Sequence, residues 1–96
     1  MQISIETLNS KNKYNTLNII DIRDNYAYTK GHIVNAKNIP KDMLINSPNK
    51  YLNKDETYYI YCQSGINSNR IVNMLNSQGY HTYNIIGGYN NYLLWK

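Results

Sequence analysis

Apolar residues along the chain gather in short runs that are separated by polar segments and by segments with helical spacing. The two clearest runs are residues 17–22 and 57–62, which are rich in β-branched, aromatic and small apolar side chains. Such dense runs predict strands that are buried on both faces of a sheet. Shorter extended segments are predicted at residues 2–5, 36–39 and 82–86.

Helices are predicted between these strands. In the clearest one, apolar residues fall at the spacing of one helix face: Ile71, Val72, Met74 and Leu75. Ser68 is a suitable N-cap for this helix, and Gly79 stands where a helix favours a glycine just after its end. Three further segments are predicted to be helical, residues 6–14, 41–45 and 89–95. A loop is predicted at residues 47–50 and a turn at residues 87–88. Residues 25–30 show no strong apolar period.

The alternation of strands and helices predicts an α/β fold with a mainly parallel five-stranded sheet and helices on both of its faces. Ninety-six residues form a single domain, 1–96, because chains usually divide only beyond about 250 residues. The content of 42% hydrophobic and 17% charged residues excludes a disordered chain.

Charge and targeting features narrow the range of partners. The net charge of +4 is scattered, which favours small anionic substrates over nucleic acid. The N-terminus lacks the basic segment and apolar run of a signal peptide, and no apolar stretch is long enough to span a membrane. We therefore expect a cytoplasmic, monomeric protein that binds neither nucleic acid nor membranes.

The single cysteine, Cys62, stands where a predicted strand ends and a glycine-containing loop begins. Ligands bind at the carboxyl ends of parallel strands, where the next helix N-terminus carries about half a positive charge. This field favours the thiolate, so we expect a lowered pKa for Cys62, with Gly65 allowing loop N–H groups to converge on an anion. A buried cysteine before an ordinary loop is the alternative interpretation. One cysteine and two histidines do not predict a metal site.

Three motifs, in order and spread over nearly the whole chain, resemble those of the rhodanese family of sulfurtransferases. The first motif resembles the pattern D-x-R followed by GHI-x-x-A-x-NIP and consists of Asp21-Ile22-Arg23 with Gly31-His32-Ile33, Ala36 and Asn38-Ile39-Pro40. The second resembles the active loop C-x-x-G-x-R-S and consists of Cys62-Gln63-Ser64-Gly65-Ile66-Asn67-Ser68. The third resembles the closing GG…W segment and consists of Gly87-Gly88 with Trp95.

The resemblance implies a rhodanese-like fold and a ping-pong reaction without metal or cofactor. Cys62 would attack the outer sulfur of thiosulfate or of a protein persulfide, become a persulfide, and pass that sulfur to cyanide, a thiol or a protein. The resemblance also implies that the loop N–H groups stabilise the negative charge of the terminal sulfur. The substrate-binding residues would then be Gln63, Ser64, Gly65, Ile66, Asn67 and Ser68.

Two positions depart from the family pattern. Asn67 stands where the commonest loop has arginine, so a full positive charge beside Cys62 is missing. This substitution opens an alternative function, a catalytically weak rhodanese module that binds or relays persulfide sulfur from a partner protein. Ala27 stands where an acid is common before Tyr28, and we expect an effect on local packing only. Related phosphatases need arginine where Ser68 stands, because a phosphoryl group requires a bidentate clamp, so phosphatase activity is disfavoured.

Other polar residues of the motifs are interpreted as structural. Asp21 and Arg23 are expected to form a salt bridge or to brace a loop, and His32 to make a structural hydrogen bond. Arg70 is expected on the surface rather than as a replacement for the missing loop charge. Trp95 is expected to pack at the C-terminal helix.

Overall fold

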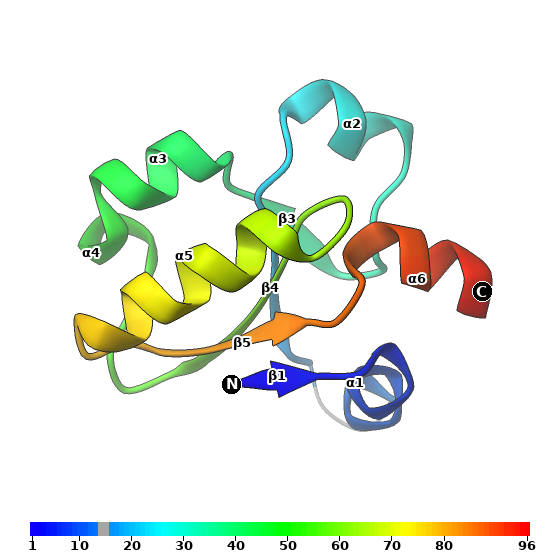
Figure 1. Cartoon of the computed structure of the whole chain (residues 1–96), viewed down its shortest axis with the longest axis horizontal. Coiled ribbons are helices and arrows are strands. Elements are labelled where there is room, and N and C mark those ends of the chain that lie inside the picture. Colours follow the sequence, from blue (N-terminus) through cyan, green and yellow to red (C-terminus); the bar gives the residue numbers. More distant parts are fainter. Residues whose placement is uncertain (14–15) are drawn as a thin grey trace.

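A computed structural model describes residues 1–13 and 16–96 of the chain (Figure 1). The described residues form one five-stranded sheet in the order β1-β5-β4-β2-β3, and all of its pairings are parallel. The strands are β1 (Gln2–Ile3), β2 (Asn18–Asp21), β3 (Ala36–Asn38), β4 (Thr57–Tyr61) and β5 (His81–Ile85). Because the strands are parallel, their carboxyl ends lie at one edge of the sheet, as the sequence predicted.

Helices cover both faces of this sheet, which confirms the predicted α/β class. The helices are α1 (Ile5–Asn12), α2 (Asn25–Lys30), α3 (Lys41–Asn46), α4 (Pro48–Tyr51), α5 (Ile66–Ser77) and α6 (Gly88–Trp95). Helices α3, α4 and α5 lie on one side, and α1 and α6 lie on the other (Figure 1). Within residues 1–13 and 16–96, none of the helices combines the length and the apolar character needed to cross a membrane.

The core consists of two layers, one on each face of the sheet. Ile20 and Ile60 pack with Leu75 of α5 in one layer, whereas Ile19 and Tyr61 pack in the other. Neighbouring residues of β2 and β4 therefore enter opposite layers, as expected for strands that are buried on both faces. The tyrosines of β4 belong to this core: Tyr58, Tyr59 and Tyr61.

Two short helices were not predicted as such. Residues 25–30, which lack a strong apolar period, form α2, and the Asp24 side chain caps this helix by accepting the Ala27 N–H at 2.8 Å. The predicted loop at residues 47–50 is wrong, because Pro48 starts the single turn of α4. Neither helix contains a buried residue, so apolar spacing could not reveal them.

The ends of two other helices also differ from the prediction. Helix α5 begins at Ile66, and its N-cap is Gly65 with φ +93°, so Ser68 lies inside the helix and is not its cap. Its other end is as predicted, since Gly79 follows with φ +96°. Helix α1 begins at Ile5, which shortens the predicted strand 2–5, and the predicted helix end at Tyr14 lies outside the described residues.

Candidate active site

Cys62 lies directly after β4, at the carboxyl edge of the sheet, and residues 63–65 connect it to α5. The side chain is only 7% exposed. Its Sγ atom accepts hydrogen bonds from the Gly65 N–H at 3.2 Å and from the Ser68 N–H at 3.4 Å. The thiol is therefore held at the N-terminus of a twelve-residue helix, where unpaired N–H groups favour a negative charge.

The balance of these contacts favours the thiolate form of Cys62. Burial raises the pKa of this thiol, but hydrogen bonds with the Ser68 hydroxyl and with the N–H groups of Ser68, Gly65 and Ser64 outweigh that effect. The pKa of Cys62 consequently lies below its ordinary value, in agreement with the expectation from sequence.

Gly65 gives the loop the backbone shape that this arrangement needs. Its φ of +93° lies in the left-handed region, which other residues rarely adopt. A Cβ atom on Gly65 would also lie 3.0 Å from the Gly87 backbone nitrogen. Both the backbone angle and the close approach therefore require glycine beside the thiol.

The first turn of α6 contacts the same loop from the other side. The Tyr89 N–H donates to the Cys62 carbonyl at 3.0 Å, and the Asn90 N–H donates to the Gln63 carbonyl at 3.0 Å. A Cβ atom on Gly88 would overlap the Cys62 carbonyl oxygen. Gly88 thus allows α6 to approach the backbone at the thiol closely.

An open pocket of about 440 Å³ lies over Cys62. It is lined by residues that follow β2, β3 and β4: Ile22, Arg23, Asp24, Ala27, Pro40, Lys41, Asp42, Cys62, Gln63, Ser64 and Asn67. Of the predicted substrate-binding residues, Gln63, Ser64 and Asn67 line this pocket, and Gly65 and Ser68 contact the thiol instead. Ile66 is 64% exposed and lines a separate hollow. Substrate binding by these six residues stays a prediction.

The charged residues of the pocket lining balance one another. Arg23 and Lys41 are cationic, and Asp24 and Asp42 are anionic. Arg70, by contrast, lines the separate hollow with Ile66, so it does not supply the charge that Asn67 lacks. The pocket therefore has no formal excess of positive charge for an anionic donor.

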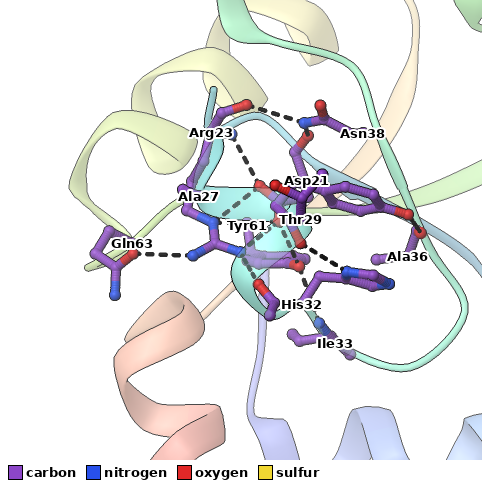
Figure 2. Close-up of polar contacts among 12 residues, drawn as sticks. Asp21, Arg23, Ala27, Thr29, His32, Ile33, Ala36, Asn38, Tyr61 and Gln63 are labelled. Carbon is purple, nitrogen blue, oxygen red and sulfur yellow. Dashed lines mark hydrogen bonds and ion pairs between the residues drawn. The ribbon is translucent and has the colours of Figure 1, made fainter. Parts of the chain in front are cut away.

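The Arg23 side chain links the buried Asp21 carboxylate to the loop (Figure 2). Its Nη2 lies 2.7 Å from Asp21 Oδ2, and its Nη1 donates to Gln63 Oε1 at 3.0 Å. The Tyr61 hydroxyl also donates to Asp21 Oδ2, at 2.7 Å. This geometry combines the salt bridge and the loop brace that were predicted for Asp21 and Arg23.

Three other residues that the sequence singled out have local roles or positions. His32 Nδ1 lies 2.9 Å from the Tyr28 carbonyl oxygen, and its ring stacks on Tyr28, which agrees with a structural hydrogen bond. Ala27 lines the Cys62 pocket, and the expected effect on local packing only stays a prediction. Trp95 is 50% exposed and packs beside the Tyr92 ring at a centroid distance of 6.4 Å, at the edge of the core rather than within it.

Sequence reasoning missed Asn84 of β5. This side chain is 3% exposed, and its Oδ1 accepts the Ser68 hydroxyl at 2.5 Å, so it lies directly behind the thiol. The only signal in the sequence was an amide residue next to apolar Ile85 in a predicted strand. Among the described residues, no three His, Cys, Asp or Glu side chains are placed to hold a metal ion.

The comparisons with known proteins agree with this geometry. A family model described as Rhodanese-like domain matches residues 4–94. The chain is 33% identical over 79 residues to the thiosulfate sulfurtransferase GlpE of Coxiella burnetii, covering 81% of this chain and 70% of that protein. It is 34% identical over 77 residues to the uncharacterized protein YqhL of Bacillus subtilis, covering 79% of this chain and 60% of that protein.

Solved structures show the same architecture. The crystal structure of a rhodanese-like domain protein from Staphylococcus aureus has a TM-score of 0.85 and is 33% identical in sequence. The similarity covers 95% of this chain and 90% of that one.

Proposed function

Since this chain belongs to the rhodanese-like domain family, we propose that it transfers a sulfane sulfur through a persulfide on Cys62. The donor would be thiosulfate or a protein persulfide, and the acceptor would be a thiol, cyanide or a protein. The observation that carries the proposal is the buried Cys62 thiol in the lining of a pocket, with two N–H groups directed at its sulfur. A relative named as a thiosulfate sulfurtransferase supports it.

The reaction would have two displacement steps, each at a sulfur atom. In the first, the Cys62 thiolate attacks the outer sulfur of thiosulfate, the sulfur–sulfur bond of thiosulfate breaks, and its electron pair leaves with sulfite. In the second, an acceptor such as cyanide attacks the terminal sulfur of the persulfide, and the Cys62 thiolate leaves as thiocyanate forms. The terminal sulfur is anionic between the steps, and the backbone N–H groups of the loop are its natural donors.

The charge of the pocket favours weak use of small dianionic donors. Thiosulfate carries two negative charges, whereas the loop amides and the α5 N-terminus offer only partial positive charge. Asn67 adds none, and the lining balances two cationic with two anionic side chains. This supports the second candidate function, in which the domain accepts or relays sulfur from the persulfide of a partner protein.

Mass spectrometry of the intact protein tests the proposed function. After incubation with thiosulfate, the native protein should gain the mass of one sulfur atom, located on Cys62, and added cyanide should remove it. Cys62→Ser should gain nothing, because a serine hydroxyl is far less acidic and its oxygen cannot hold the transferred sulfur. An equal gain in Cys62→Ser would refute Cys62 as the carrier.

The two candidate functions are separated by the donor that loads Cys62. A free-standing enzyme would form the persulfide readily with thiosulfate alone. A relay module would form it faster from a protein persulfide, for example that of a cysteine desulfurase, at much lower donor concentration. Rates of persulfide formation with both donors on the same protein decide between them.

A further inference from the structure

A buried chain of hydrogen bonds runs behind the Cys62 thiol, on the side away from the pocket. The thiol donates to Ser68 Oγ at 3.3 Å, and the Ser68 hydroxyl donates to Asn84 Oδ1 at 2.5 Å. Asn84 Nδ2 in turn donates to the Gly65 carbonyl at 3.4 Å. Cys62, Ser68 and Asn84 are 7%, 0% and 3% exposed, so these groups are largely shielded from water.

The Gly65 carbonyl sets the orientation of the Asn84 amide. If the amide were flipped, Asn84 Oδ1 would face the Gly65 carbonyl oxygen, and two acceptors would meet without a hydrogen between them. The Asn84 oxygen therefore faces Ser68, where it receives the hydroxyl hydrogen.

Ser68 has a single hydroxyl hydrogen, and two groups can receive it. While Cys62 is a thiol, the Ser68 hydroxyl donates its hydrogen to Asn84 Oδ1, and the Ser68 oxygen accepts from the thiol. When Cys62 loses its proton, the hydroxyl must turn to Sγ, or else its oxygen faces the thiolate. Turning leaves the buried Asn84 oxygen unpaired, which is unfavourable, so Asn84 offsets part of the stabilisation that the Ser68 hydroxyl gives to the thiolate.

We propose that Asn84 is a positioning residue that directs the Ser68 hydroxyl and so sets how readily the Cys62 thiolate forms. Ser68 serves the thiol as an acceptor and the thiolate as a donor, and Asn84 sets the balance between these states. This inference rests on the proposed function only for the role of Cys62 as nucleophile.

The charged groups around the thiol lie in the pocket and in the hollow that borders Asn84. Arg23, Asp24, Lys41 and Asp42 line the pocket in front of the thiol, and Arg70 lines the hollow that borders Asn84. All five are retained in the variants below, so their influence on the thiol is the same in the native protein and in each variant.

The test is the pH dependence of the alkylation of Cys62 by iodoacetamide in Asn84→Leu. Leucine has nearly the shape of asparagine but does not accept a hydrogen bond, and the Gly65 carbonyl keeps the Asn69 N–H as a partner at 3.2 Å. The Ser68 hydroxyl is then free to donate to the thiolate. The inflection of the alkylation profile should fall by roughly one pH unit, which raises the alkylation rate below that inflection about tenfold.

A second substitution shows whether this effect passes through Ser68. In a Ser68→Ala background, Asn84→Leu should change the inflection by less than about 0.3 units, because the hydroxyl through which Asn84 acts on the thiol is then missing. Such non-additivity is expected for two residues of one hydrogen-bond network. Thr82→Val removes another buried hydroxyl from β5 and should leave the inflection unchanged.

The outcomes are distinct from those of the sulfur-transfer assay. Asn84→Ala removes the same acceptor and replaces Asn84→Leu if the latter does not fold. An unchanged or raised inflection in the Asn84 variant, or an equal fall when Ser68→Ala is present, overturns the proposal. Alkylation reports the thiol whether or not a persulfide forms, so a failure of the proposed function leaves this result readable.

Discussion

Asn67 lies on the lining of the Cys62 pocket and contributes no charge to it. It is exposed and belongs to the first turn of α5, so a longer side chain at this position can reach the pocket without disturbing the core. This makes residue 67 the natural place to change the electrostatics of donor binding alone.

We expect Asn67→Arg to raise kcat/KM for thiosulfate about tenfold, chiefly through a lower KM. A guanidinium a few ångströms from the donor contributes about 1–2 kcal/mol at an effective dielectric constant of about 20. It attracts the bound donor and the transition state alike, so KM changes more than kcat. Steady-state kinetics with thiosulfate and cyanide measure the effect.

Asn73→Arg is the matched control for this change. Asn73 is exposed on the same helix but does not line the pocket, so the variant has the same net charge with the new cation elsewhere. It should leave the kinetics nearly unchanged. An equal gain in both variants would assign the effect to overall charge, and no gain in Asn67→Arg would show that residue 67 does not limit donor binding.

The start of α5 depends on one backbone angle, the φ of Gly65. Ser68 has the side chain of an N-cap, and the sequence cannot distinguish a cap from a serine inside the first turn. Gly65 is the cap because its left-handed φ turns the chain, and this places the Ser68 N–H and hydroxyl at the thiol. Because Ser68 was predicted to cap the helix, its contact with the Cys62 thiol was not predicted.

Gly65→Val should reduce sulfur transfer far more than it reduces stability. A β-branched side chain at φ +93° strains the loop by about 1–3 kcal/mol, which a folded domain tolerates. Displacement of the Gly65 N–H from Sγ by about 1 Å should lower the rate of transfer about a hundredfold. Sulfur-transfer rates and urea unfolding report the two effects separately.

Gly79→Val provides the comparison for Gly65→Val. Gly79 has nearly the same φ, +96°, but lies at the other end of α5, beside the Lys54 side chain. Gly79→Val carries the same backbone strain without the close approach to Gly87, so it should lose stability by no more than Gly65→Val and keep full activity. If the two variants lost activity equally, strain of the fold rather than the amide cradle would explain the effect.

The residues of the site that lie close together in the sequence could be predicted. The residues that other strands bring to the site could not. Cys62, Gly65 and Asn67 lie close together in the sequence, at the end of β4, in the loop and at the start of α5, so their spacing predicts a site. Lys41 and Asn84 reach it from residues after β3 and from β5, and only the strand order brings these elements beside the loop. The order of strands within a sheet does not follow from the order of the segments along the sequence.

At the scale of the whole molecule, two apolar layers hold the sheet while the thiol lies at its edge. Cys62 packs against one of these layers, so its ionisation is linked to folding as well as to reactivity. A group whose pKa is lower in the folded state stabilises that state in its charged form. This stabilisation is full above the pKa of the unfolded chain and is lost as the pH falls through the folded pKa.

The stability of the native protein relative to Cys62→Ser should therefore rise with pH. The rise should begin near the lowered pKa of Cys62. It should end near the ordinary pKa of a cysteine thiol, about 8.5. Urea unfolding of both proteins between about pH 6 and pH 9.5 measures the difference in the free energy of unfolding. A difference that is constant, or that falls with pH, would mean that folding does not favour the thiolate.

Two amides of α6 donate to the Cys62 and Gln63 carbonyls, so their hydrogen exchange reports how often the loop opens. Each opening of the loop exposes the Tyr89 and Asn90 amides to deuterium, whereas the Asn91 amide donates to Gly87, beside α6 itself. Sulfur on Cys62 adds an anion for the loop to enclose, so deuterium uptake should slow at Tyr89 and Asn90 more than at Asn91. Equal slowing would show that the whole helix had stiffened. Hydrogen exchange can thus follow loading of the thiol without a probe on the sulfur.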